Sequence, residues 1–167
     1  MGNAVLVVNS EWIERAIPDF VFGVPCRVLA AEEVIASKIF VSRRERFDGA
    51  DVMHLIRACG ESLDWNRIQA LLSPHWEMLY WSLVLFSYVY PAHTNLVPPK
   101  VWEDLTTRFQ DHVRNPKSES PFRGSLIDPN MFAIDVNEWG ERDLYREYRE
   151  RHPFLLQAIP SARGRTE

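Results

Sequence analysis

Apolar residues recur at intervals of three and four through the middle of the chain, which is the spacing of helices that bury one face. In one such stretch, Val52, Leu55, Ile56 and Cys59 occupy positions i, i+3, i+4 and i+7. We therefore predict a series of consecutive helices that share one core. Their expected ranges are residues 30–46, 48–60, 64–72, 73–90 and 100–113.

Short polar residues mark where several of these helices should begin or end. Asp48 and Asp51 suit the N-cap and first turn of one helix, where backbone N–H groups need acceptors. Asp64 suits the same place in the next helix, and Gly60 is a natural stop between the two. These residues predict compact helices joined by short turns.

The amino-terminal part has a different pattern, in which valine and phenylalanine are frequent. Residues 4–8 predict a short strand, and residues 10–17 predict one or two helical turns. Residues 20–29 predict a second strand that is kinked or lies at an edge, because Pro25 cannot donate to a sheet. We therefore expect a mainly α fold with a short amino-terminal β element.

The most apolar segment, residues 78–90, carries no charged side chain. As a helix its 13 residues would rise about 20 Å, which is short of the roughly 30 Å of membrane hydrocarbon. We interpret it as part of a helix central in the core, with Trp76, Leu83 and Phe86 buried, and expect no membrane association.

Beyond the last of these helices, residues 114–123 are rich in Pro, Ser and Asn and predict a linker. The expected organisation is a main region at 1–113, the linker, an extension at 124–145, and a charged helix with its tail at 146–167. Acids and arginines alternate over residues 141–152, which favours a solvated helix with i,i+4 ion pairs. Residues 161–167 should form a frayed tail.

Composition narrows the class of protein. The 167 residues are 46% hydrophobic and 25% charged, with a net charge of −4, which is typical of a soluble globular protein and excludes a broadly basic nucleic-acid surface. Cys26 and Cys59 are too few for a disulfide framework, so we expect reduced thiols in a cytoplasmic protein. Common catalytic motifs are absent and the five histidines are scattered. We assign no catalytic and no metal-binding residue.

One local group of charges stands out. Lys38 lies within an otherwise apolar stretch, and burying an ammonium is costly without an anionic partner. That partner could be a bound phosphate, or it could be Asp48 or Asp51, or the side chain could reach water along its own stem. Spacing alone favours the internal explanations. The nearby basic run at residues 43–46 would by default be a solvated helix end.

Several motifs resemble a known family. Glu32-Glu33 is followed by an apolar residue and then by Lys38, and a basic residue leads into Asp48 and Asp51 at D-x-x-D spacing. Further stretches agree at residues 63–65, 83–91, 123–126 and 139–143, together with Asp135. Over roughly residues 9–145, the chain is similar to bacterial nucleotidyltransferase-like proteins of the DNA polymerase beta superfamily, in a largely uncharacterised branch.

The resemblance implies that this chain is the helical flank of an α/β nucleotidyltransferase fold. A complete homologue would hold Mg²⁺ and a nucleoside triphosphate through a Gly-Ser turn and D-x-D carboxylates. That motif is missing here, because Gly124-Ser125 lies far downstream with no D-x-D after it. We therefore expect that the start is misplaced, that the gene is truncated or that the catalytic half was lost, and we carry over no metal ligand. Lys38, Arg44 and Arg46 remain as candidate nucleotide contacts, with Asp48 and Asp51 as support.

Two functional hypotheses follow. The first is a nucleotidyltransferase-family protein that is inactive as this chain alone. The second is a non-catalytic helical interaction module that binds a partner, or a second copy of itself, through its amino-terminal edge. Missing sheet neighbours would leave an unpaired strand edge and an apolar face there.

Overall fold

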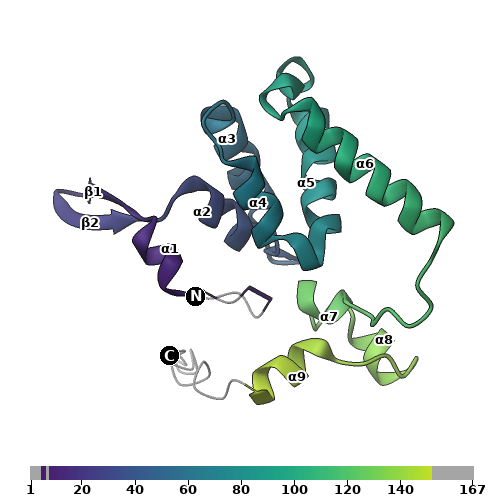
Figure 1. Cartoon of the computed structure of the whole chain (residues 1–167). Helices are drawn as coiled ribbons and strands as arrows, with labels where there is room; N and C mark the ends of the chain where they lie inside the picture. The colour runs from purple at the N-terminus through teal and green to yellow at the C-terminus, as the bar shows by residue number, and fades with distance from the viewer. Residues whose placement is uncertain (1–4, 7, 152–167) are drawn as a thin grey trace, which may run out of the picture. The chain divides into compact units, whose positions relative to one another are not determined.

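The computed structural model describes residues 5–6 and 8–151, which divide into two compact units between residues 120 and 121. Figure 1 shows the order of the elements along the chain. Most of the described residues are helical, and strands occur as two small antiparallel pairs. The expected fold class, mainly α with a short amino-terminal β element, is confirmed.

The amino-terminal β element is a hairpin. After α1 (Ser10–Glu14), strand β1 (Ile17–Val21) pairs with β2 (Val24–Val28). Phe22 and Gly23 form the turn with φ of 52° and 79°, and positive φ at both positions is what a tight two-residue hairpin turn requires. The single kinked strand expected at residues 20–29 is therefore wrong, because Gly23 reverses the chain rather than bending it.

The strand expected at residues 4–8 is also not found. Val5, Leu6 and Val8 lie outside any strand, while positions 4 and 7 lie outside the described residues. Leu6 is buried and packs in the core cluster. The described part of the apolar run, with Val5 also packed against the core, therefore contributes side chains to the core rather than a strand.

Helix α2 (Ala31–Lys38) ends eight residues before the expected boundary at Arg46. The chain then turns through a small hairpin of β3 (Ser42–Arg43) and β4 (Arg46–Phe47). The backbone N–H of Asp48 donates to the Val41 carbonyl at 2.9 Å and closes this loop. The helix prediction was wrong here because buried Ile39 and Phe40 continue the apolar pattern beyond Lys38, the last residue of the helix.

The remaining elements of the first unit follow the predicted series of helices closely. They are α3 (Gly49–Cys59), α4 (Trp65–Leu71), η1 (Ser73–His75), α5 (Trp76–Val89), η2 (Pro91–Leu96) and α6 (Pro99–Arg114). Asp64 caps α4 as expected, because its carboxylate accepts from the Arg67 N–H at 3.0 Å. Asp48 precedes α3, but its carboxylate is bonded to other side chains.

Helix α5 has one buried face and one exposed face. Leu83 and Phe86 are fully buried as predicted, whereas Trp76 is only half-buried. On the other side Val84 and Tyr88 are exposed, so apolar composition alone overstated how central this helix is. Among the described residues, no helix has the length and apolar character needed to cross a membrane.

The second unit contains α7 (Gly124–Ile127), α8 (Ala133–Asn137) and α9 (Leu144–Arg151). A side chain at Gly124 would overlap the rings of Phe122 and Phe132, which explains glycine at this position. Helix α9 is the expected charged helix, with an i,i+4 ion pair of 2.9 Å between Arg146 and Glu150. The tail at residues 161–167 lies outside the described residues.

We expect Leu83→Ala to lower the free energy of unfolding by about 2–5 kcal/mol, because it leaves a cavity in the core. Val84→Ala is the matched control on the exposed side of the same helix and should change it by less than about 0.5 kcal/mol. Urea unfolding measures both. Equal effects of the two substitutions would contradict the described orientation of α5.

Candidate functional site

Lys38, the residue singled out by the sequence, is the last residue of α2 rather than a mid-helix residue. Its ammonium donates to Asp51 at 2.6 Å and to Asp48 at 3.1 Å. The side chain is 27% exposed, so it lies at the rim of the core rather than inside it. The structure thus joins Lys38 to both aspartates that the sequence offered as internal partners.

Asp48 is the centre of this group. Arg46 donates two hydrogen bonds to its carboxylate, from Nε to Oδ1 and from Nη2 to Oδ2, each 2.8 Å long. Only 9% of the Asp48 side chain is exposed. The hydrogen bonds from Arg46 lower the pKa of Asp48, burial opposes this, and Lys38 lowers the pKa further. Asp48 is therefore held as a carboxylate.

The four charges balance one another. The hydrogen bond to Asp51 raises the pKa of Lys38, burial opposes it, and Asp48 adds to the rise. Two cations, Lys38 and Arg46, face two carboxylates, Asp48 and Asp51. A phosphate bound here would have to compete with both carboxylates for the same hydrogen-bond donors.

The other basic residues of this stretch lie on the β3–β4 hairpin and not at a helix end. Arg43 is paired directly with Arg46 across the two strands, and Arg44 stands in the turn between them. Both are exposed, and the Arg46 side chain is 67% exposed. The hairpin thus presents a small basic surface beside the balanced group.

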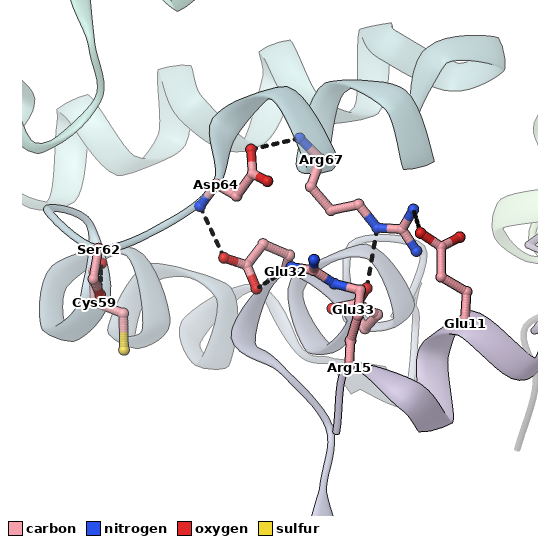
Figure 2. A network of polar contacts seen from close by, with 8 residues as sticks. All are labelled: Glu11, Arg15, Glu32, Glu33, Cys59, Ser62, Asp64 and Arg67. Carbon is pink, nitrogen blue, oxygen red and sulfur yellow. Dashed lines mark hydrogen bonds and ion pairs between the residues drawn. The ribbon is translucent and has the colours of Figure 1, made fainter. Parts of the chain in front are cut away.

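A second polar network, which the sequence analysis did not assign, surrounds Glu33 on α2 (Figure 2). The Glu33 side chain is fully buried, and its Oε1 accepts from Arg15 Nε at 3.0 Å and from Arg67 Nε at 3.1 Å. Its neighbour Glu32 accepts from the backbone N–H of Asp64 at 2.8 Å. These two carboxylates join α1, α2 and α4, which lie far apart in sequence.

Arg67 extends this network to the first helix. Its Nη1 donates to Glu11 at 2.8 Å. Burial acts to lower the pKa of Arg67, but the hydrogen bonds to Glu11 and Glu33 outweigh it and raise the pKa. Two buried atoms, Glu33 Oε2 and Arg67 Nη2, have no hydrogen-bond partner among the residues that the structure describes. The interior of the network thus contains one acceptor atom and one donor atom that make no hydrogen bond to a described residue.

A signal for this network was present in the sequence. Glu32 precedes Ile35, Ala36 and Ile39 by three, four and seven residues, which places a carboxylate on the buried face of the helix. A carboxylate in that place needs a cationic or N–H partner. What sequence could not supply was the identity of Arg15 and Arg67, because those contacts depend on the tertiary fold.

Both networks are suited to holding elements together. Each pairs cations with carboxylates, and the ion pairs made by Lys38 and by Glu33 join residues that are at least ten positions apart in the sequence. Within residues 5–6 and 8–151, no group of three or more His, Cys, Asp or Glu side chains is arranged to hold a metal ion. Comparison with known proteins finds no matching family model, curated protein or solved structure.

We expect Glu33→Gln to lower the free energy of unfolding by about 3–5 kcal/mol, because two arginines lose a buried charged partner. The control Glu11→Gln removes an exposed carboxylate from the same network and should cost less than about 1 kcal/mol. Thermal and urea unfolding report both. Comparable small losses would show that Glu33 does not hold the fold.

The ion pairs of Asp48 lead to a prediction of how the stability of the protein depends on pH. Asp48→Asn should cost about 1–3 kcal/mol near neutral pH, because charged hydrogen bonds are lost. Since folding lowers the pKa of Asp48 below 3.8, its contribution is present above that pH and disappears as pH falls through the folded-state value. The stability difference between the two proteins should therefore shrink on going from about pH 6 to about pH 2. A difference independent of pH, measured by urea unfolding, would contradict this.

Proposed function

We propose that this chain is the helical, non-catalytic part of a nucleotidyltransferase-type protein and that it works by binding another protein through the β1–β2 hairpin. One observation carries the proposal. Every residue of β1 and four of the five residues of β2 are exposed, although most of them are apolar. A two-stranded hairpin of this kind is only marginally stable by itself in water, which favours a partner that covers it.

The exposed apolar residues of the hairpin lie within one short segment of the chain, residues 17–28. Phe20 is 70% exposed, Phe22 at the turn is fully exposed, and four aliphatic side chains of the strands are exposed as well. Single exposed apolar residues are ordinary on soluble proteins, but a whole element of them is not. This concentration supports a binding role for the hairpin.

The hairpin is also firmly joined to the rest of the first unit. Arg27 of β2 donates to the carbonyls of Ala16 at 2.7 Å and Glu14 at 3.1 Å, at the end of α1. Helix α1 is in turn held by buried Trp12 and by the ion pairs of Arg15. The hairpin therefore projects from a fixed base, away from helices α3–α6 (Figure 1).

A second candidate is nucleotide binding at Lys38, Arg44 and Arg46, as the family resemblance implies. The observation in its favour is that these residues lie at the surface, with the Arg46 guanidinium largely exposed. Against it, Lys38 and Arg46 are already bonded to Asp48 and Asp51. The resemblance places Mg²⁺ in homologues that carry the Gly-Ser and D-x-D motif, which is missing from this sequence, so we propose no Mg²⁺ site here.

For the proposed function, we expect the native chain to elute in an assembly larger than a monomer when gently extracted from the cells that make it. Phe22→Ser combined with Val24→Ser should shift it to the monomer position. Because both residues are exposed, the free energy of unfolding should change by less than about 1 kcal/mol.

The matched control for this experiment is Tyr88→Ser, which removes an exposed aromatic residue from α5. This variant should remain in the assembly. If the hairpin variant and the native chain elute together, the hairpin is not the binding element.

The variant Lys38→Met tests the second candidate function, nucleotide binding, against a purely architectural role of Lys38. If Lys38 is architectural, the variant loses about 1–3 kcal/mol of stability, since charged hydrogen bonds to two carboxylates are removed. The parent chain should then show no saturable ATP binding in a calorimetric titration with magnesium. Lys100→Met is the control, because Lys100 forms only an exposed i,i+4 pair with Asp104. Saturable ATP binding that Lys38→Met abolishes without loss of stability would establish the nucleotide site instead.

A further inference from the structure

The register of the hairpin shows which backbone groups face outward. Because the loop has two residues, the flanking pair Val21–Val24 is a hydrogen-bonded pair, and pairs then alternate along the strands. Pro18, Phe20, Pro25 and Arg27 therefore belong to the non-hydrogen-bonded pairs, and their backbone groups point away from the partner strand. Proline at two of these places agrees with this register, because proline has no N–H to donate.

Both edges of the hairpin are consequently poor templates for another strand. Pro18 and Pro25 supply no outward N–H. The outward N–H of Phe20 already donates to the Asp19 carboxylate at 2.7 Å. Of the four outward positions in these two described strands, Arg27 is left to supply an N–H. This matches the way natural proteins protect sheet edges from pairing.

The faces of the hairpin differ from its edges. Directly paired residues point to the same side of a sheet, so one side carries three cross-strand pairs. We name this side the valine face, and it consists of Ile17, Asp19, Val21, Val24, Cys26 and Val28. Its four aliphatic residues are all exposed. The opposite side carries Arg27, whose guanidinium donates to the backbone carbonyls of Glu14 and Ala16. Part of that side is therefore already bonded within the chain.

The charge on the valine face indicates which partner fits it. Asp19 is the one charged residue of the six and lies in the central pair, opposite Cys26. Two copies packed face to face about a two-fold axis would bury two Asp19 carboxylates in one apolar interface, which is unfavourable without a cation. A different protein with a basic group at that place would complement the face.

We propose that the valine face docks against an apolar surface of a different protein, which places a lysine or arginine opposite Asp19, and that the partner adds no strand to the hairpin edges. This inference rests on the proposed function, because it names the surface and partner chemistry for the same hairpin. Phe22 extends the contact at the tip. It holds a positive φ that residues other than glycine rarely adopt, and its exposed ring is suited to a pocket of the partner.

The test begins with photo-crosslinking of the full chain in the cells that make it. Benzoylphenylalanine is placed at Val24 on the valine face, at Phe20 on the opposite face, or at Tyr88 on α5 as a control. We expect one protein to be crosslinked from Val24 and not from Phe20 or Tyr88. Mass spectrometry of the crosslinked peptide should place it in an apolar surface that includes a lysine or arginine.

The purified partner then gives the quantitative test. Asp19→Lys should weaken binding at least tenfold, and replacing the partner's basic residue with aspartate should restore it. Asp19→Asn keeps an acceptor for the Phe20 N–H while removing the charge, so a severalfold loss with this variant separates charge from hairpin stability. Tyr88→Ser on α5, outside the hairpin, should leave affinity unchanged. Pro25→Val, which adds an outward N–H, should also leave it unchanged.

Other outcomes overturn the inference in distinguishable ways. Crosslinking from Val24 to a second copy would make the valine face a self-association surface. Crosslinking only from Phe20, or tighter binding by Pro25→Val, would leave the proposed function standing and refute the docking mode. If Asp19→Lys binds as well as the native chain, charge complementarity is wrong. If no protein is crosslinked from either face, the inference and the proposed function both fail.

Discussion

The buried carboxylate of Glu33 is the interaction on which the arrangement of the first unit depends. It has no exposure to water and is bonded to Arg15 next to α1 and to Arg67 on α4. A buried charge of this kind is strongly unfavourable unless its partners are in place, so the three elements are constrained together. Because the β1–β2 hairpin follows α1 after two residues, the same constraint fixes the base from which the hairpin projects.

The charged group around Asp48 acts in a similar way at the other end of α2. Lys38 and Arg46 join the end of that helix to the start of α3 across the β3–β4 hairpin. Their charges are matched by the two aspartates, so this group is largely satisfied without a ligand. The β1–β2 hairpin, by contrast, carries several exposed apolar side chains, and for this reason we propose the binding role for it.

The sequence predicted the helical part of the fold well because local signals decided it. Asp64, Gly60 and the apolar stripe of α3 are short-range features, and they hold in the structure. The hairpin and the end of α2 were missed for a different reason. Gly23 is compatible with both a kink and a reversal, and the choice depends on whether Val21 and Val24 can pair.

In the candidate site, too, the sequence predicted the local contacts and missed those that depend on the tertiary fold. Spacing brought Lys38, Asp48 and Asp51 together as alternatives, and the structure places all three in contact. The network around Glu33 depends on contacts 18 and 34 residues away, to Arg15 and Arg67. No local pattern identifies such partners, although the position of Glu32 beside the apolar stripe of α2 indicates that its carboxylate needs a cationic or N–H partner.

The most direct test of the central claim is hydroxyl-radical footprinting of the native chain, compared between the purified protein and the intact cells that make it. We predict strong modification of Phe22 and its neighbours in β1 and β2 in the purified chain and clear protection in cells. Tyr88, which is 84% exposed on α5, should be modified alike in both samples and serves as the internal reference. Equal modification of the hairpin in both samples would contradict the claim that it is a binding surface.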